Sequence, residues 1–167
     1  MQTLLPLAEQ VAILLKSRAQ TIAVAESSTG GLIAAALVAV PGASAYFVGG
    51  GVIYTAAAQR GLLDIPAEQM RGVRGSTEAY ARLGARAMRA RLGTSWAIAE
   101  TGATGPTGNR YGDAAGHSCI AVSGPVERAI TVETGQNNRV DNMRAFALAA
   151  FGLLISCLEE CLNEAPR

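Results

Sequence analysis

The chain has 167 residues, of which 50% are hydrophobic and 16% are charged, a composition typical of one folded domain rather than of a disordered segment. The formal net charge of +1 lacks the basic surplus that general nucleic-acid binders carry, so we expect no nucleic-acid partner. Three cysteines without paired or Cys-x-x-Cys spacing, together with one histidine, predict neither a disulfide framework nor a metal site.

The first part of the chain predicts a helix, a strand and a second helix. Apolar residues at helical spacing indicate an amphipathic helix over 4–18. The short apolar run 21–26 is typical of a strand buried on both faces, and 30–40 has a helical composition that ends before Pro41. The segment AESSTGG (25–31) therefore lies at a strand-to-helix corner.

That corner is suited to holding an anion or to presenting a hydroxyl group. Its glycines allow a tight turn, and the free amides and dipole of the following helix favour negative charge. Ser27, Ser28 and Thr29 supply hydroxyls that could act as a nucleophile or could simply cap the helix. Glu26 could be a base, a ligand contact or an acceptor for neighbouring amides, and periodicity does not choose among these roles.

The middle of the chain continues the alternation of strands and helices. A glycine-rich turn leads into a second buried strand at 49–55, and a short helix follows at 56–63. Residues 76–93 predict a longer helix, with Ser76 as its N-cap and Gly93 as its end.

The last part predicts a third buried strand, a long loop, a hairpin and a closing helix. The strand covers 94–102, and the polar, glycine-rich loop 102–116 is long enough to suggest a functional role. Strands at 117–124 and 127–135 would form the hairpin, and 138–162 would form the helix. The apolar run at 144–158 within this helix is too short to cross a membrane.

Crossover helices between buried strands predict a single α/β domain over 1–167, a three-layer α/β/α sandwich with a mixed, mostly parallel sheet. Ligands bind such sheets outside the carboxyl ends of the strands, which points to three corners, 26–31, 53–60 and 101–108. With no signal peptide and no membrane span evident, we expect a cytoplasmic protein without a membrane partner.

Several common catalytic templates are missing from the sequence. It contains no GxxxxGK[ST] loop, no GxGxxG fingerprint after a strand and no GxSxG elbow. A Ser-His-Asp arrangement would have to use His117, the only histidine, which we expect to be a partly solvated strand-end residue instead.

Four segments together resemble the CinA C-terminal domain family, whose members include nicotinamide-nucleotide amidohydrolases. They are AESSTGG (25–31), GGGVIYTAAAQRGLL (49–63), TGATGPTG (101–108) and NRVDNMRAFALAAFGLL (138–154). The resemblance covers about residues 4–162 with the motifs in the family's order. In many bacteria this domain follows a molybdopterin-binding-like domain, and we expect the stand-alone form here.

The resemblance makes Ser27 the candidate nucleophile, because it matches the serine of the family pattern A-E-S-C-T-G-G. Ser28 stands where a cysteine is usual, and Tyr54 matches the tyrosine of the second motif. Gln59 stands at the position of that motif's lysine, with Arg60 beside it. A lysine of lowered pKa can accept the serine proton, whereas a glutamine cannot and an arginine stays charged.

The third family motif matches at Thr101, Gly102 and Gly105, and the arginine of the last helix matches Arg144, with Arg139 nearby. Either arginine could hold a phosphate group. The resemblance also implies a homo-oligomer.

The implied reaction converts nicotinamide mononucleotide and water into nicotinate mononucleotide and ammonia, without a metal or other cofactor. Ser27 would attack the carboxamide, amides near Ser28 would hold the oxyanion, and Tyr54 and Thr101 would position the proton or the pyridine ring. The implied substrate-binding residues are Glu26, Ser28, Thr29, Gly30, Gly31, Gln59, Arg60, Gly102, Gly105, Arg139 and Arg144. The alternative is a catalytically silent nucleotide-binding relative that lacks the base, because the family lysine is Gln59.

Overall fold

The computed structural model describes residues 1–163, in which five strands form one sheet with the order β2-β1-β3-β4-β5. The strands are β1 (Ile22–Glu26), β2 (Phe47–Val52), β3 (Trp96–Ala103), β4 (His117–Ser123) and β5 (Arg128–Glu133). β1 pairs in parallel with β2 and β3, and β4 pairs antiparallel with β3 and β5. All strands except β4 therefore point the same way, as expected for a mixed, mostly parallel sheet.

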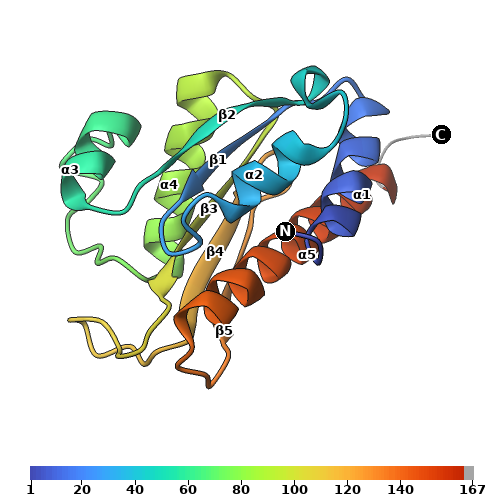
Figure 1. Cartoon of the computed structure of the whole chain (residues 1–167). Coiled ribbons are helices and arrows are strands. Elements are labelled where there is room, and N and C mark those ends of the chain that lie inside the picture. The colour runs from blue at the N-terminus through green and yellow to red at the C-terminus, as the bar shows by residue number, and fades with distance from the viewer. Residues whose placement is uncertain (164–167) are drawn as a thin grey trace.

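Helices cover both faces of this sheet, which confirms the predicted three layers. α1 (Leu5–Lys16), α2 (Leu32–Ala39) and α5 (Arg139–Asn163) lie on one face, and α4 (Glu78–Leu92) lies on the other (Figure 1). The short helix predicted at 56–63 is a turn of α-helix, α3 (Ala56–Ala58), followed by a π-helical turn, η2 (Gln59–Leu63). A 3-10 turn, η1 (Ala43–Ala45), precedes β2. Among residues 1–163, no helix combines the length and the apolar character that crossing a bilayer requires.

The two faces of the sheet carry side chains of different size. The face under α1, α2 and α5 carries large residues such as Trp96, Ile98 and Ile120, all fully buried. The face under α4 is filled mainly by alanines of β1 and β3. A Cβ added at Gly84 of α4 would lie 3.3 Å from the Cβ of Ala99, so the helix rests almost directly on the sheet.

Two local predictions were wrong. The strand around 49–55 is not buried but forms the edge of the sheet as β2, with half-buried and exposed residues in alternation. The N-cap of α4 is Thr77 rather than Ser76, because the Thr77 hydroxyl accepts the Tyr80 amide at 3.2 Å. Gly93, with φ of 62°, ends the helix as predicted.

Candidate active site

Two matching strand ends place two buried carboxyl groups beside each other. The segment AVAES (23–27) ends β1 and AIAET (97–101) lies in β3, and the two strands pair in register from Ala23–Ala97 to Ala25–Ala99. Glu26 and Glu100 therefore lie together at the carboxyl ends of the strands, only 1% and 3% exposed. Glu100 was missed by the sequence analysis, although the repeated A-[VI]-A-E-[ST] pattern could have identified it.

Glu26 caps the second helix. Its carboxylate accepts hydrogen bonds from the amides of Gly31 (3.0 Å), Ile33 (3.0 Å) and Ala34 (2.8 Å). Burial raises the pKa of Glu26 above its ordinary value; the amide hydrogen bonds oppose this shift and the nearby Glu100 charge adds to it. Of the roles considered for Glu26, the structure therefore shows the structural one, in which the side chain satisfies the first turn of α2.

Glu100 fixes the shape of the turn that follows β1. Its carboxylate accepts the amides of Ser27 (3.2 Å) and Thr29 (2.9 Å), and the hydroxyls of Thr29 (3.0 Å), Ser118 (2.9 Å) and Ser28. Two carboxylate oxygens offer about four lone-pair positions, so these donors use the full acceptor capacity of Glu100. Glu100 thus holds the turn and has no free lone pair for a proton from Ser27.

The prediction that the free amides of this corner face a ligand is wrong for most of them. The two carboxylates occupy the amides of Ser27, Thr29 and Gly31, and the Gly30 amide donates to the Ser27 carbonyl at 3.2 Å. Within residues 1–163, the structure leaves the Ser28 amide without a hydrogen-bond partner. An oxyanion at this corner would therefore have the Ser28 amide as its backbone donor.

Ser27 is the serine of this turn whose hydroxyl stays free. It makes no hydrogen bond within the described residues and lines a cleft of about 640 Å³ at the carboxyl edge of the sheet. The cleft brings together five of the predicted site residues, namely Ser27, Tyr54, Gln59, Thr101 and Gly102. Further walls come from the segment before α4, from the first turn of α4 and from the loop after β3, and they include Arg74, Ser76, Tyr80, Asn109, Arg110 and Tyr111.

Arg139 joins the closing helix to the rim of the cleft. Its guanidinium donates to the Tyr54 hydroxyl and to the Gly105 carbonyl, both at 2.7 Å. Gly105 has φ of 108°, and a Cβ at this position would lie 2.6 Å from the Asn137 carbonyl oxygen, so only glycine fits. Gly105 therefore acts through its backbone, as an anchor for Arg139.

The other predicted arginines lie outside the cleft, and two unpredicted ones line it. Arg144 pairs with Asp141 at 3.3 Å, and Arg60 is exposed and is not part of the cleft wall. Arg74 and Arg110 face the cleft instead. Arg110 lies in the 102–116 loop for which the sequence suggested a functional role, whereas Arg74 lies in a segment that matches none of the quoted motifs and is identified by the folded arrangement.

An ion pair closes one side of the cleft. Arg74 donates to both carboxylate oxygens of Asp113 at 2.6 and 2.9 Å, and Asn109 adds a bond of 2.9 Å. The hydrogen bond from Arg74 is the main reason that the pKa of Asp113 falls to about 2. The loop after β3 is thereby held against the segment that precedes α4.

We expect Asp113→Asn to remove a pH-dependent part of the stability. Since the pKa of Asp113 is lowered from 3.8 to about 2, the ion pair stabilises the fold above pH 3.8 and is lost as the pH falls through about 2. At pH 7 the free energy of unfolding of the variant should be about 1 kcal/mol lower than that of the wild type. This difference should shrink as the pH falls from about 4 to about 2. Urea unfolding at several pH values measures it. The exposed Asp64→Asn is the matched control, and a pH-independent difference would contradict the expectation.

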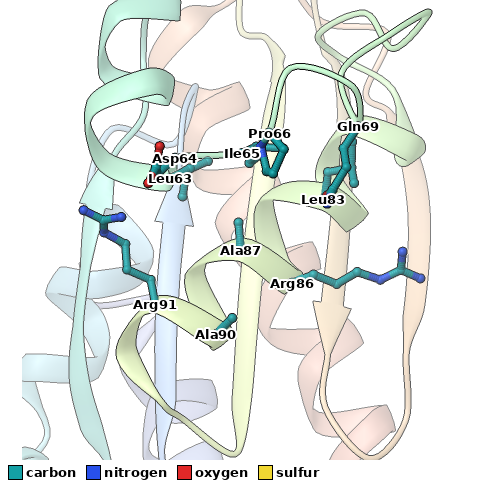
Figure 2. A pocket seen from close by; sticks show the side chains of 10 residues that line it. All are labelled: Leu63, Asp64, Ile65, Pro66, Gln69, Leu83, Arg86, Ala87, Ala90 and Arg91. Atoms are coloured by element: carbon teal, nitrogen blue, oxygen red, sulfur yellow. The ribbon is translucent and has the colours of Figure 1, made fainter.

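A second cleft, of about 480 Å³, lies against the outer side of α4 and shares no residue with the first. Figure 2 shows Ala87 and Ala90 facing the segment around Ile65, with Arg86 and Arg91 pointing to opposite sides. None of the predicted site residues lines it. Among residues 1–163, no group of three or more His, Cys, Asp or Glu side chains is arranged to hold a metal ion.

Residues 4–158 match the family described as the CinA C-terminal domain. A CinA-like protein of Parasynechococcus marenigrum is 44% identical over 119 residues, which cover 71% of this chain and 28% of that protein. A CinA-like protein of Gloeobacter violaceus is 39% identical over 139 residues, which cover 83% of this chain and 33% of that protein. The chain thus spans a third or less of the length of these relatives.

Solved structures show the same fold. A competence-damaged protein (CinA) superfamily protein from Klebsiella pneumoniae superposes with a TM-score of 0.87 at 26% identity, covering 94% of this chain and 98% of that one. The competence/damage inducible protein CihA from Agrobacterium tumefaciens gives a TM-score of 0.83 at 27% identity, covering 93% and 95%. Both comparisons agree with the match of residues 4–158, and the chain belongs to the CinA C-terminal domain family.

Proposed function

We propose that the protein is a serine amidohydrolase that converts nicotinamide mononucleotide into nicotinate mononucleotide and ammonia. The observation that carries this proposal is the Ser27 hydroxyl. Its neighbours Ser28 and Thr29 both donate to Glu100, whereas Ser27 has no internal partner and lines the 640 Å³ cleft. A free serine hydroxyl, held by a fixed turn at the carboxyl edge of a sheet, is suited to nucleophilic attack.

The cleft can supply the other contacts that this reaction needs. The Ser27 oxygen would attack the carboxamide carbon, the C–N bond would break to release ammonia, and water would then cleave the ester to give the carboxylate. The Ser28 amide is the available donor for the oxyanion. Tyr54, held by Arg139, and Thr101 would orient the pyridine ring. Arg110 and Arg74, the latter paired with Asp113, also line the cleft and would supply positive charge for the phosphate.

A second candidate function is binding of the mononucleotide without turnover. The positions of the side chains that could accept the Ser27 proton favour it. Lys16 is the only lysine in the sequence, and it is an exposed residue of α1 whose Nζ lies 6.0 Å from the centre of the Tyr46 ring, outside the cleft. His117 does not line the cleft. Gln59 lines it, and its side-chain nitrogen is buried without a hydrogen-bond partner in the described part of the chain. This amide can donate to a ligand but cannot take a proton.

Ammonia release from nicotinamide mononucleotide, measured with the purified protein, separates the two functions. Release together with nicotinate mononucleotide supports the amidohydrolase. No release, combined with a rise in Tm when the mononucleotide is added, supports the binding protein. If there is no ammonia release and no rise in Tm, both functions are contradicted.

Gln59→Lys tests whether the missing base limits the reaction. A lysine at this buried position would have a lowered pKa and could accept the Ser27 proton, a contribution of about 10²-fold or more in rate. We expect kcat for ammonia release to rise, with little change in the mononucleotide concentration needed to raise Tm. Gln69→Lys, at an exposed position outside the cleft, is the control. Unchanged kcat in a folded, ligand-binding Gln59→Lys protein would show that another group accepts the proton.

A further inference from the structure

The only histidine of the chain connects two acceptors on different elements. His117 begins β4, as predicted, but it is buried, with 8% of its surface exposed, rather than partly solvated. Its Nε2 lies 2.9 Å from the carbonyl oxygen of Ser76, and its Nδ1 lies 2.5 Å from Oε1 of Glu133, the residue paired with it on β5. A carbonyl and a carboxylate can only accept, so both ring nitrogens must carry hydrogen for both bonds to form. The two hydrogen bonds therefore form together only in the doubly protonated imidazolium.

The residue that His117 holds is a strained part of the cleft wall. Ser76 is buried and has φ of 55°, a left-handed conformation that is unfavourable for a residue with a Cβ. Its amide donates to the Thr101 hydroxyl at 3.2 Å, and its carbonyl also accepts the Cys119 thiol at 3.6 Å. Ser76 and Thr101 both line the cleft, so the position of one affects the other.

The charges around the ring favour its protonated form. Burial by itself lowers the pKa of His117, but the hydrogen bonds to Glu133 and Ser76 and the charges of Glu133 and Asp113 raise it above its ordinary value. On the same strand, the Cys119 sulfur lies 3.7 Å from Nε2, and burial raises the pKa of this thiol, which keeps it neutral. From α4, Glu78 accepts the Thr131 hydroxyl and adds a further negative charge near Cys119.

We propose that His117 is a positioning residue that acts as a pH-sensitive clamp on the cleft, holding Ser76 only while both ring nitrogens are protonated. When the ring loses one proton, the remaining proton stays on Nδ1, facing the charged Glu133 carboxylate. The Nε2 lone pair then faces the Ser76 carbonyl oxygen, and that hydrogen bond is lost. Ser76 relaxes, and its amide no longer fixes the Thr101 hydroxyl.

NMR tests the clamp without a substrate, and a single histidine makes the ring signal unambiguous. The ring nitrogens and the backbone amides of Ser76 and Thr101 are followed through a pH titration of the wild type and of Glu133→Gln. We expect the two amides to shift with the same midpoint as the ring, and Glu133→Gln to move all these midpoints to lower pH. Glu127→Gln, which removes an ion-paired carboxylate near the start of β5, is the control and should move none of them.

Two results would overturn the clamp: amides of Ser76 and Thr101 that do not respond when the ring titrates, or midpoints that Glu133→Gln leaves in place. A merely structural histidine would give one of these results. Neither depends on the proposed function.

The effect on catalysis rests on the proposed function. If the protein is the proposed amidohydrolase, kcat/KM for the mononucleotide should fall as the pH rises through the midpoint of the His117 titration. In Glu133→Gln this fall should occur at lower pH. A fall that stays fixed while the NMR midpoints move would overturn the catalytic role of the clamp. An absence of ammonia release would count against the amidohydrolase, and the NMR titration would still decide whether the clamp exists.

Discussion

Ser27→Ala is expected to abolish ammonia release from nicotinamide mononucleotide, with a loss of about 10³-fold or more in kcat/KM. The variant removes the attacking oxygen and nothing else that the structure depends on, because this hydroxyl makes no hydrogen bond within residues 1–163. Its free energy of unfolding should therefore stay within about 0.5 kcal/mol of the wild type. Ammonia release and urea unfolding, measured on the same preparation, test both expectations.

Ser28→Ala is the matched control for this prediction. Its hydroxyl donates to the buried Glu100, so its removal should lower the free energy of unfolding by about 1–3 kcal/mol while the nucleophile remains. Ser27→Ala should thus lower ammonia release without changing stability, whereas Ser28→Ala should lower stability and leave the nucleophile in place. Retained ammonia release in Ser27→Ala would contradict the assignment of the nucleophile.

Glu100→Ala should have the largest effect on stability, about 3–5 kcal/mol. The carboxylate satisfies two amides and three hydroxyls, and most of these donors are buried. Without it they lose their acceptor and have little access to water, and an unsatisfied buried donor costs about 1–3 kcal/mol. The midpoint of urea unfolding should fall steeply, and water that enters the space would recover only part of the loss.

Glu9→Ala provides the comparison, because Glu9 is an exposed glutamate of α1. Its removal should change the free energy of unfolding by no more than about 0.5 kcal/mol. If Glu100→Ala were as stable as Glu9→Ala, the hydrogen bonds around Glu100 would not hold the turn that presents Ser27.

Most of the fold could be predicted because its signals are local. The apolar run of β1, the stop before Pro41 and the left-handed Gly93 each depend on a few neighbouring residues. The burial of β2 could not be predicted in this way, since it depends on which strand lies at the edge of the sheet. Seven small or apolar residues, GGGVIYT, suit either position.

The position of the cleft at the carboxyl ends of the strands could be predicted from the sequence, whereas the catalytic and binding roles of its residues stay predictions. Ser27, Tyr54 and Thr101 do meet at one cleft, because the carboxyl ends of β1, β2 and β3 lie together. The acceptor that binds the hydroxyls and amides of this corner could not be predicted from residues 25–31 alone, since the Glu100 carboxylate that binds Ser28 lies 72 positions further along the chain. The cytoplasmic location and the homo-oligomer stay predictions.

The close contact between α4 and the sheet limits how this cleft can change. Gly84, Ala99 and Ser27 line a cavity of only about 10 Å³, so there is little free volume between α4 and the sheet next to Ser27. A larger side chain at Gly84 or Ala99 would have to push the whole helix outward. A relative that accommodates a bulkier ligand would therefore acquire that room more easily from the segment before α4 and from the loop after β3. These two lining segments can lengthen or shorten without disturbing the contact between α4 and the sheet.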